Sequence, residues 1–298
     1  MHPLLRICLP ALLALLTWEA RAQQAFATPT AAVDALIAAL GTEHADPQRM
    51  AALLGDDWQT FIPTDDIERK DVDAFLALYR EQRTIRLAGE ERASLVVGNT
   101  PWTFPLPLVH GRDGWRFDPR AGGEEIRARR IGRNELAAMQ AVRAYHDAQM
   151  DYAEADHDGD GVLEYAQQFM SSDGRYDGLY WPDEPGVPQS PLGPLFGDEL
   201  PDGEWQGYRY RILDAQGPSA PGGAYAYRIG ADMSRGFALV AWPARYGDSG
   251  VMSFMISHDG LVFEKDMGPD GAKLALAMPR FDPDSSWHEV KEAELAQP

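Results

Sequence analysis

The sequence predicts an α+β protein: N-terminal helices with a small curved antiparallel sheet, then one long helix packed on an antiparallel meander. Three observations support this class. Amphipathic helical segments open the chain, a long helical pattern begins near Asn134, and short strand patterns follow both of them. We therefore expect two units of mixed structure.

The N-terminal unit is expected to begin with three helices. Thr28-Pro29 starts the first and Asp46-Pro47 the second, because a polar cap followed by proline is typical of a first helical turn. The third is predicted from Asp71 to Glu81, with its apolar residues on one side. Strand patterns at 94–98 and 115–118 then predict a small curved sheet.

A long helix is predicted to open the C-terminal unit. Gly122-Gly123 and the charged segment after them mark the expected boundary, and Asn134 is a good helix cap. An apolar stripe steps along the helix by three and four residues: Ala138, Ala141, Tyr145, Ala148 and Tyr152. Such a stripe is suited to lying across a sheet.

The rest of the C-terminal unit is predicted to be an antiparallel meander. Apolar and polar residues alternate at 207–213 and again at 224–229, as in strands with one buried face. Residues 236–242 are continuously apolar, which predicts a central strand covered on both faces. Asp259-Gly260 provides hairpin turn chemistry between the last two strand patterns.

Residues 1–22 have the features of a cleaved signal peptide: an early arginine, a short apolar run and a small-x-small site ending at Ala22. The run is shorter than the roughly 20 residues of a membrane-spanning helix, so no stable membrane insertion is expected after cleavage. The predicted domains are therefore 23–123 and 124–290, with a tail at 291–298. We expect a periplasmic or secreted protein. The only cysteine, Cys8, lies in the segment to be removed.

The charge balance is strongly acidic, with 27 basic against 46 acidic residues and a net charge of −19. Such a field repels phosphate backbones, so nucleic acid is not an expected partner. It attracts cations and basic surfaces instead.

Several stretches together resemble an exported bacterial family known as domain of unknown function 2950. They include DGLYWP, SPLGPL, GYRYRILDAQGP and GFALVAWPARYGDSGVMSFMISHDGLVFEKDMGPD, and they cover nearly the whole mature chain. No activity, cofactor or catalytic residue is established for that family. The resemblance therefore implies an exported protein and assigns no site.

The C-terminal unit also resembles, more weakly, the head domain of type IV pilins and pseudopilins. The resemblance rests on the long helix NELAAMQAVRAYHDAQMDY and on the later strands FALVAWP and SGVMSFMISHDG. In pilins such a helix packs on such a sheet. Pilins also keep an apolar N-terminal helix for assembly, whereas here that segment is a cleavable leader. The resemblance thus implies a pilin-like interaction module.

The stretch DHDGDGVLEYAQ fits the spacing of a calcium-binding loop of the EF-hand type. Ligands in such a loop come from positions 1, 3, 5, 7, 9 and 12, with glycine at position 6. Numbering from Asp156 places Gly161 at position 6. The predicted metal ligands are Asp156, Asp158, Asp160, the carbonyl of Val162, Glu164 and Gln167.

Gln167 departs from this pattern, because a bidentate glutamate normally closes the cage at position 12. We therefore expect weak calcium affinity, unless Asp173 or Asp177 contributes a further carboxylate. The alternative is a solvated acidic Asp-Gly turn without a metal. The sequence leaves both interpretations open.

No catalytic residues are predicted. Residues 247–250, GDSG, resemble the nucleophile segment of trypsin-like proteases, but no upstream histidine lies in that family's setting, so a turn between strands is expected. His146 and Asp147 are neighbours on a helix. Their side chains should point about 100° apart, so we do not expect them to form an acid–base pair.

Two further features have a structural and a functional interpretation. Four arginines form a basic island, Arg127, Arg129, Arg130 and Arg133, which could bind an acidic partner or pair with Glu124, Glu125 and the acidic loop. Tyr180-Trp181 lies beside carboxylates and could form a sugar or peptide surface. It could equally anchor a long loop on the sheet.

The sequence therefore favours an exported, non-catalytic binding or assembly module of the bacterial cell envelope, with a weak calcium loop as a further possibility. Its expected partner is an envelope protein or glycan. The alternative is an envelope hydrolase that uses clustered carboxylates from Asp156, Asp158, Glu164 or Asp177.

Overall fold

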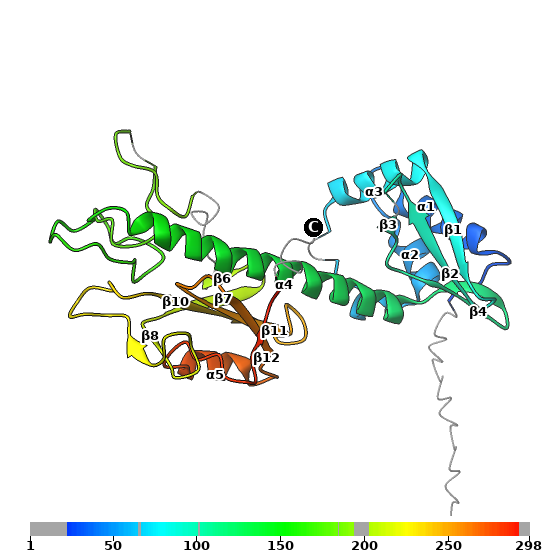
Figure 1. The fold of residues 1–298 in the computed structure, drawn as a ribbon. Helices are drawn as coiled ribbons and strands as arrows, with labels where there is room; N and C mark the ends of the chain where they lie inside the picture. The colour runs from blue at the N-terminus through cyan, green and yellow to red at the C-terminus, as the bar shows by residue number, and fades with distance from the viewer. Residues whose placement is uncertain (1–22, 65–66, 101, 184, 194–202, 292–298) are drawn as a thin grey trace, which may run out of the picture. The chain divides into compact units, whose positions relative to one another are not determined.

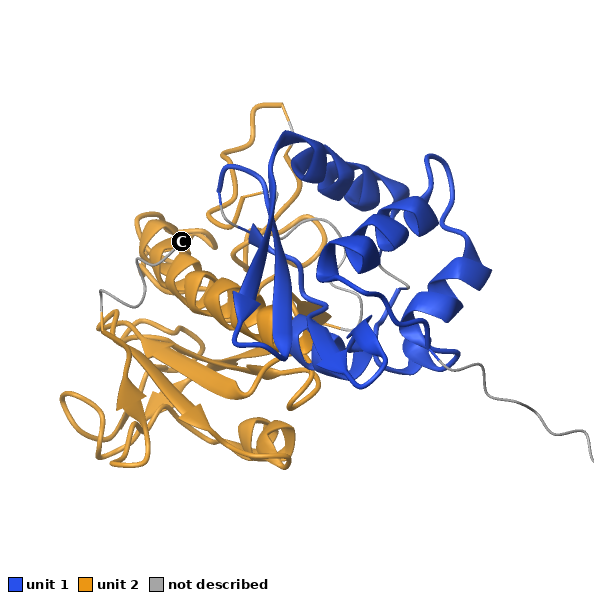
Figure 2. Cartoon of the chain, turned by 90° about the vertical axis from the view of Figure 1, so that its right-hand side faces the viewer, with its two compact units in different colours: residues 1–126 blue, residues 127–298 orange. Residues whose placement is uncertain are grey.

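The computed structural model describes residues 23–64, 67–100, 102–183, 185–193 and 203–291. The chain divides into two compact units, Met1–Ile126 and Arg127–Pro298 (Figure 2). Both contain helices and antiparallel sheet, which confirms the predicted α+β class. The predicted signal peptide and the predicted tail from residue 292 onward lie outside the described residues.

Unit 1 begins with helices α1 (Pro29–Leu40), α2 (Pro47–Leu54) and α3 (Arg69–Glu81), with a 3-10 turn, η1 (Trp58–Thr60), before α3. The predicted caps of the first two helices are present. Thr28 Oγ1 accepts the N–H of Ala31 at 3.1 Å, and Asp46 Oδ1 accepts the N–H of Gln48 at 3.0 Å. Helix α3 starts two residues earlier than predicted, because the Asp71 carboxylate reaches back to the N–H of Glu68 at 2.9 Å.

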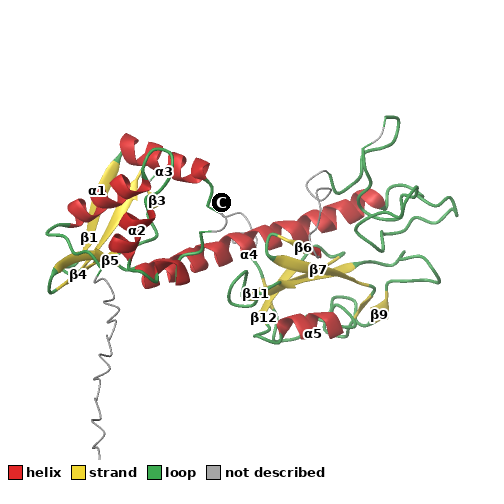
Figure 3. Ribbon diagram, turned by 180° about the vertical axis from the view of Figure 1, so that it is seen from behind, coloured by secondary structure: helices red, strands yellow, loops and turns green. Residues whose placement is uncertain are grey.

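The helices of unit 1 cover one face of an antiparallel sheet (Figure 3). Its strands are β1 (Arg83–Ala88), β2 (Arg92–Val97), β3 (Trp102–Thr103), β4 (Leu108–Gly111) and β5 (Gly114–Phe117). They follow the order β1-β2-β4-β5, with β3 paired to β2. The register gives one face to the core residues Ala93, Leu95, Val97, Leu108 and Phe117. The side chains between them point to the other face.

Helix α4 (Pro119–Tyr152) begins well before the predicted cap at Asn134, so that part of the prediction is wrong, and it passes through Gly122-Gly123. The two units divide between Ile126 and Arg127, three residues after the predicted boundary. The glycines serve close packing instead of ending a helix. A Cβ on Gly123 would lie 2.2 Å from the carbonyl oxygen of Phe61, and one on Gly122 would lie 2.8 Å from Leu106. The side-chain amide of Asn134 donates to the carbonyl of Ser249 at 2.9 Å. The division between the units therefore falls inside a helix.

Unit 2 contains a six-stranded antiparallel sheet in the order β13-β12-β11-β10-β7-β6. The strands are β6 (Glu204–Trp205), β7 (Tyr208–Leu213), β10 (Ala238–Pro243), β11 (Met252–Ser257), β12 (Val262–Asp266) and β13 (His288–Glu289). Every residue of β10 is buried, as its continuous apolar pattern predicts. The strand predicted at 224–229 is shorter: β9 (Tyr225–Ala226) pairs with β8 (Ala215–Gln216) outside this sheet.

Helix α4 and the short helix α5 (Gly271–Ala277) cover opposite faces of the unit 2 sheet (Figure 1). The whole predicted stripe of α4 is buried, and the Tyr145 hydroxyl donates to the carbonyl of Ala238 at 3.4 Å. On the other face, Arg211 donates to the carbonyl of Ala275 at 2.7 Å. None of the helices in the described segments is both long and apolar enough to cross a bilayer.

Candidate cation-binding site

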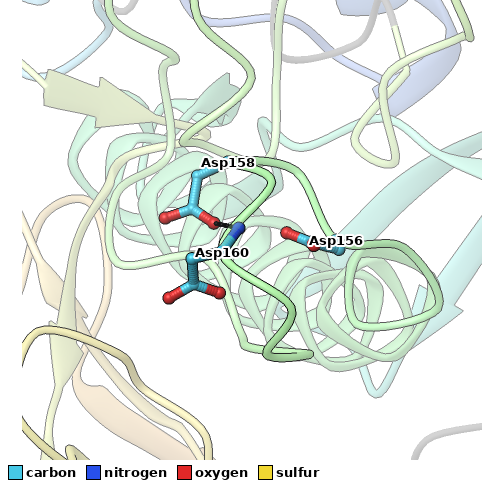
Figure 4. Close-up of side chains that lie close together, drawn as sticks. All are labelled: Asp156, Asp158 and Asp160. Carbon is cyan, nitrogen blue, oxygen red and sulfur yellow. Dashed lines mark hydrogen bonds between the residues drawn. The ribbon is translucent and has the colours of Figure 1, made fainter.

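The acidic loop starts where α4 ends, and it gathers three exposed aspartates (Figure 4). One carboxylate oxygen of each of Asp156, Asp158 and Asp160 lies within 4.8 Å of the others. Carboxylate oxygens are the ligands that calcium prefers in proteins. The predicted first, third and fifth positions are therefore brought together.

Asp156 holds the loop in shape through the backbone. Its Oδ1 accepts the N–H of Gly159 at 2.7 Å, and its Oδ2 accepts the N–H of Gly161 at 2.9 Å. The hydrogen bond from Gly161, and then the one from Gly159, hold the pKa of Asp156 below its usual value. Gly161 has φ +88°, a left-handed conformation that glycine adopts without strain, as the sixth position of the predicted loop requires.

Two of the later predicted ligands, Glu164 and Gln167, have other contacts. Among the described residues, the group of carboxylates close enough to share a cation contains Asp156, Asp158 and Asp160 and does not include Glu164. The Gln167 amide donates to the carbonyl of Ala231 at 2.8 Å and also hydrogen-bonds to Glu164. Gln167 therefore ties the loop to a neighbouring turn, and its side chain does not close a cage.

No helix follows the loop over residues 164–170. The segment instead bonds to other parts of unit 2. The N–H of Tyr165 donates to the carbonyl of Met233 at 2.9 Å, and both backbone groups of Ala166 bond to the side chain of Gln149. The paired helices of an EF-hand are therefore not formed, and only the first helix and the loop remain.

A cleft of about 460 Å³ lies beside the loop. Its lining includes four carboxylates, Asp158, Glu164, Asp177 and Asp232, and one arginine, Arg175. They come from the acidic loop, from residues 174–177 shortly after it, and from the turn at 231–232, which is more than 50 residues further along the chain. The volume is within the range of small-molecule sites. A cleft with this excess of negative charge attracts cationic groups.

Aromatic rings form one wall of the cleft. Tyr152 and His157 stack with ring centroids 4.0 Å apart, and His157 Nε2 lies 2.9 Å from the carbonyl oxygen of Tyr152. The Tyr152 hydroxyl donates to the carbonyl of Tyr176 at 2.9 Å. This wall joins the end of α4 to the turn that carries Asp177.

Two carboxylates of the cleft have pKa values that move in opposite directions. Burial, and then the nearby Asp158 and Asp232, raise the pKa of Glu164. Burial would also raise the pKa of Asp177, but hydrogen bonds from the backbone and hydroxyl of Ser172 and from Gln168 together lower it. Of these two carboxylates, Glu164 is therefore the one that more readily holds a proton.

The other predicted features have structural roles. Ser249 of the GDSG turn is buried, and its Oγ accepts the N–H of Arg245 at 2.9 Å. Arg130 of the basic island pairs with Asp248, a partner that the sequence did not suggest. Trp181 is buried and donates to the carbonyl of Pro188 at 2.8 Å, so it anchors its loop.

The expectation for His146 and Asp147 is wrong. Their Nδ1 and Oδ1 atoms lie 3.1 Å apart, although the Asp147 side chain is 81% exposed. Rotation about the side-chain bonds overcomes the divergence of neighbouring helical positions. The pair is on the surface of α4, and neither residue lines the cleft.

The sequence analysis assigned no role at this site to Gln149, Arg175 or Asp232, among others. Gln149 is a fully buried amide inside the apolar stripe pattern, and a polar residue there is a usable signal. Nothing in the local sequence distinguishes Asp232 or Arg175 from other charged turn residues. Only the fold brings them to the cleft.

Residues 23–290 match the model of a family described as "Protein of unknown function (DUF2950)". Comparison with curated proteins and with solved structures gives no match, so the similarity to pilin heads stays a prediction.

Proposed function

The chain belongs to the DUF2950 family, and from this premise we propose that it is an exported, non-catalytic binding module of the bacterial cell envelope that takes up calcium at its acidic loop. The partner that binds at this site is an envelope protein or a glycan. Export rests on the signal-peptide pattern of residues 1–22.

The observation that carries the proposal is the grouping of Asp156, Asp158 and Asp160, whose carboxylate oxygens lie within 4.8 Å of one another next to a cleft lined by further carboxylates. Glu164 lines that cleft, so its carboxylate adds to the negative charge beside the three aspartates. Without a bidentate glutamate, such a site is expected in the weak class, with a dissociation constant of roughly 10⁻⁴ to 10⁻³ M. That range suits a protein outside the cytoplasm.

Calorimetric titration with calcium chloride tests the proposal. The wild-type chain should bind calcium saturably, and Asp156→Ala/Asp158→Ala should give no binding heat. A control with the same loss of charge, Asp147→Ala/Asp151→Ala on the exposed surface of α4, should bind as the wild type does. A wild-type chain without heat up to about 10 mM calcium, well above the weak extracellular range, would contradict the proposal.

An envelope hydrolase is the second candidate, and one observation favours it. Glu164 and Asp177 line the same cleft with pKa values moved in opposite directions, which is the pattern of a general acid and a base. We favour binding because Asp177 already accepts three hydrogen bonds, from Ser172 N–H, the Gln168 amide and the Ser172 hydroxyl. A glycan- or peptide-hydrolysing activity that both Glu164→Gln and Asp177→Asn abolish would reverse this preference.

A further inference from the structure

The outer face of the unit 1 sheet, which is the face opposite the core, carries positively charged side chains and, among the described residues of its strands, no carboxylate. The register places Arg86, Arg92 and Arg116 on the face opposite the core, and all three are exposed. The other outward residues of β1, β2 and β4 carry no charge: Thr84, Ala88, Ser94, Val96, Val109 and Gly111. Three cations and no carboxylate therefore share this face, in a chain where acidic residues outnumber basic ones by 46 to 27.

These three arginines are not neutralised by partners. Within the described residues, none of their guanidinium groups has a carboxylate within 4.0 Å. The Arg116 guanidinium lies over Gly111, about 3.5 Å from the position that a Cβ would take there. Unpaired charges of one sign add their potentials, so this face has a local positive field despite the net charge of the chain.

The arginines form a track across the sheet. Arg92, Val109 and Arg116 lie on one transverse row, so Arg92 and Arg116 are two strands, or about 10 Å, apart. Arg86 lies one strand away from Arg92 and two residues further along, a separation of about 8 Å. A single small anion needs donors that converge on one point. Charges spaced across the face of a sheet fit a chain of anions instead.

We propose that this face binds a linear polyanion that carries phosphate groups. The planar guanidinium fork of arginine matches phosphate oxygens in pairs. No aromatic side chain points outward from β1, β2 or β4, so bases have no ring to stack on and a nucleic acid gains nothing beyond its phosphates. No large apolar side chain on this face is available to enter a membrane.

The net charge of −19 does not prevent such a contact. At physiological ionic strength the Debye length is about 8 Å, so carboxylates elsewhere in the chain are largely screened from this face. The proposal is independent of calcium binding in unit 2, because it uses residues of unit 1 alone.

Titration with linear polyphosphate tests the proposal, with orthophosphate at the same phosphate concentration as the small-anion comparison. The affinity for polyphosphate should fall linearly with the logarithm of salt concentration, with a slope of about −2 to −3 for three contacts. The variant Arg86→Ala/Arg92→Ala/Arg116→Ala should bind about a hundredfold more weakly, since each arginine near a charged surface contributes roughly fivefold. Its circular dichroism and melting temperature should match the wild type.

A control variant removes the same charge from exposed positions elsewhere: Arg80→Ala/Arg143→Ala/Arg228→Ala. It should keep the wild-type affinity. The proposal is overturned if the wild type does not bind polyphosphate, if both triple variants lose affinity equally, or if orthophosphate competes at equal phosphate concentration. Stronger binding to phosphatidylglycerol vesicles, or to oligothymidine of equal phosphate number, would assign the face to a membrane or to nucleic acid and would also overturn it.

Discussion

The side-chain amide of Gln149 on α4 bonds to both backbone groups of Ala166. Its Nε2 donates to the carbonyl at 2.8 Å, and its Oε1 accepts the N–H at 2.8 Å. Gln149 is fully buried and also donates to the Tyr145 hydroxyl at 2.9 Å. This amide replaces the missing second helix as the support for the segment after the acidic loop.

Replacing Gln149 by leucine should lower the free energy of unfolding of unit 2 by about 2–5 kcal/mol, because the buried N–H and carbonyl of Ala166 lose their partners. Gln140→Leu, at an exposed position of the same helix, should change it by less than about 0.5 kcal/mol. Urea denaturation followed by a unit 2 tryptophan signal measures both. Equal effects would show that the two hydrogen bonds contribute nothing.

Gly132→Ala should stabilise the protein by about 0.5–1 kcal/mol, because alanine loses less conformational freedom than glycine in a helix. Gly132 is exposed within α4, and a Cβ there would meet no atom within 4 Å. A rise in melting temperature is the expected result. A fall would mean that α4 is not helical at this position.

Gly123→Ala, unlike Gly132→Ala, should destabilise the protein and lower its free energy of unfolding by about 1–3 kcal/mol. The added Cβ would lie 2.2 Å from the Phe61 carbonyl oxygen, so backbone must move. The same melting experiment compares it with Gly132→Ala. Stabilisation by both substitutions would contradict the close packing of α4 on unit 1.

Gly161→Ala should weaken calcium binding by about five- to thirtyfold while every carboxylate stays in place. The residue has φ +88°, and alanine in a left-handed conformation costs about 1–2 kcal/mol. Gly186→Ala, with φ +90° in another loop, adds comparable strain away from the site and should leave the affinity unchanged. Calorimetry distinguishes them, and equal affinities would show that the loop conformation does not matter.

Glu164→Gln should stabilise the protein at pH 7 and should have little effect below about pH 4. The folded-state pKa of Glu164 is raised, mainly by burial and then by Asp158 and Asp232, so the folded protein holds this proton more tightly than the unfolded chain. Its contribution to stability is fully present below the unfolded pKa and is lost as the pH rises through the folded pKa. Unfolding measured from pH 3 to 8 tests this. A stabilisation independent of pH would contradict it.

The predictable parts of the fold are those set by neighbouring residues. Thr28 and Asp46 cap helices because their side chains reach the N–H groups two or three residues ahead, which is local chemistry. The stripe of α4 and the continuous β10 were predicted from periodicity for the same reason.

The parts that were not predictable depend on distant contacts. From the local sequence, Gly122-Gly123 predicts an interruption between two structural elements. The helix continues through them, because the close contacts with Phe61 and Leu106 require residues without a side chain. A helix follows the loop in an EF-hand, yet here Gln149 and Met233 bond to Ala166 and Tyr165 and no helix forms at residues 164–170. Of the predicted metal ligands, the aspartates two residues apart were brought together, whereas the position of Gln167 depends on Ala231.

Asp156 accepts hydrogen bonds from the N–H groups of Gly159 and Gly161, and these bonds set the path of the acidic loop without a metal. A cation that binds there therefore meets carboxylates that are already grouped. Occupancy should then change the electrophoretic mobility of the protein far more than its circular dichroism. A partner that responds to calcium here should therefore sense the neutralised charge by direct contact.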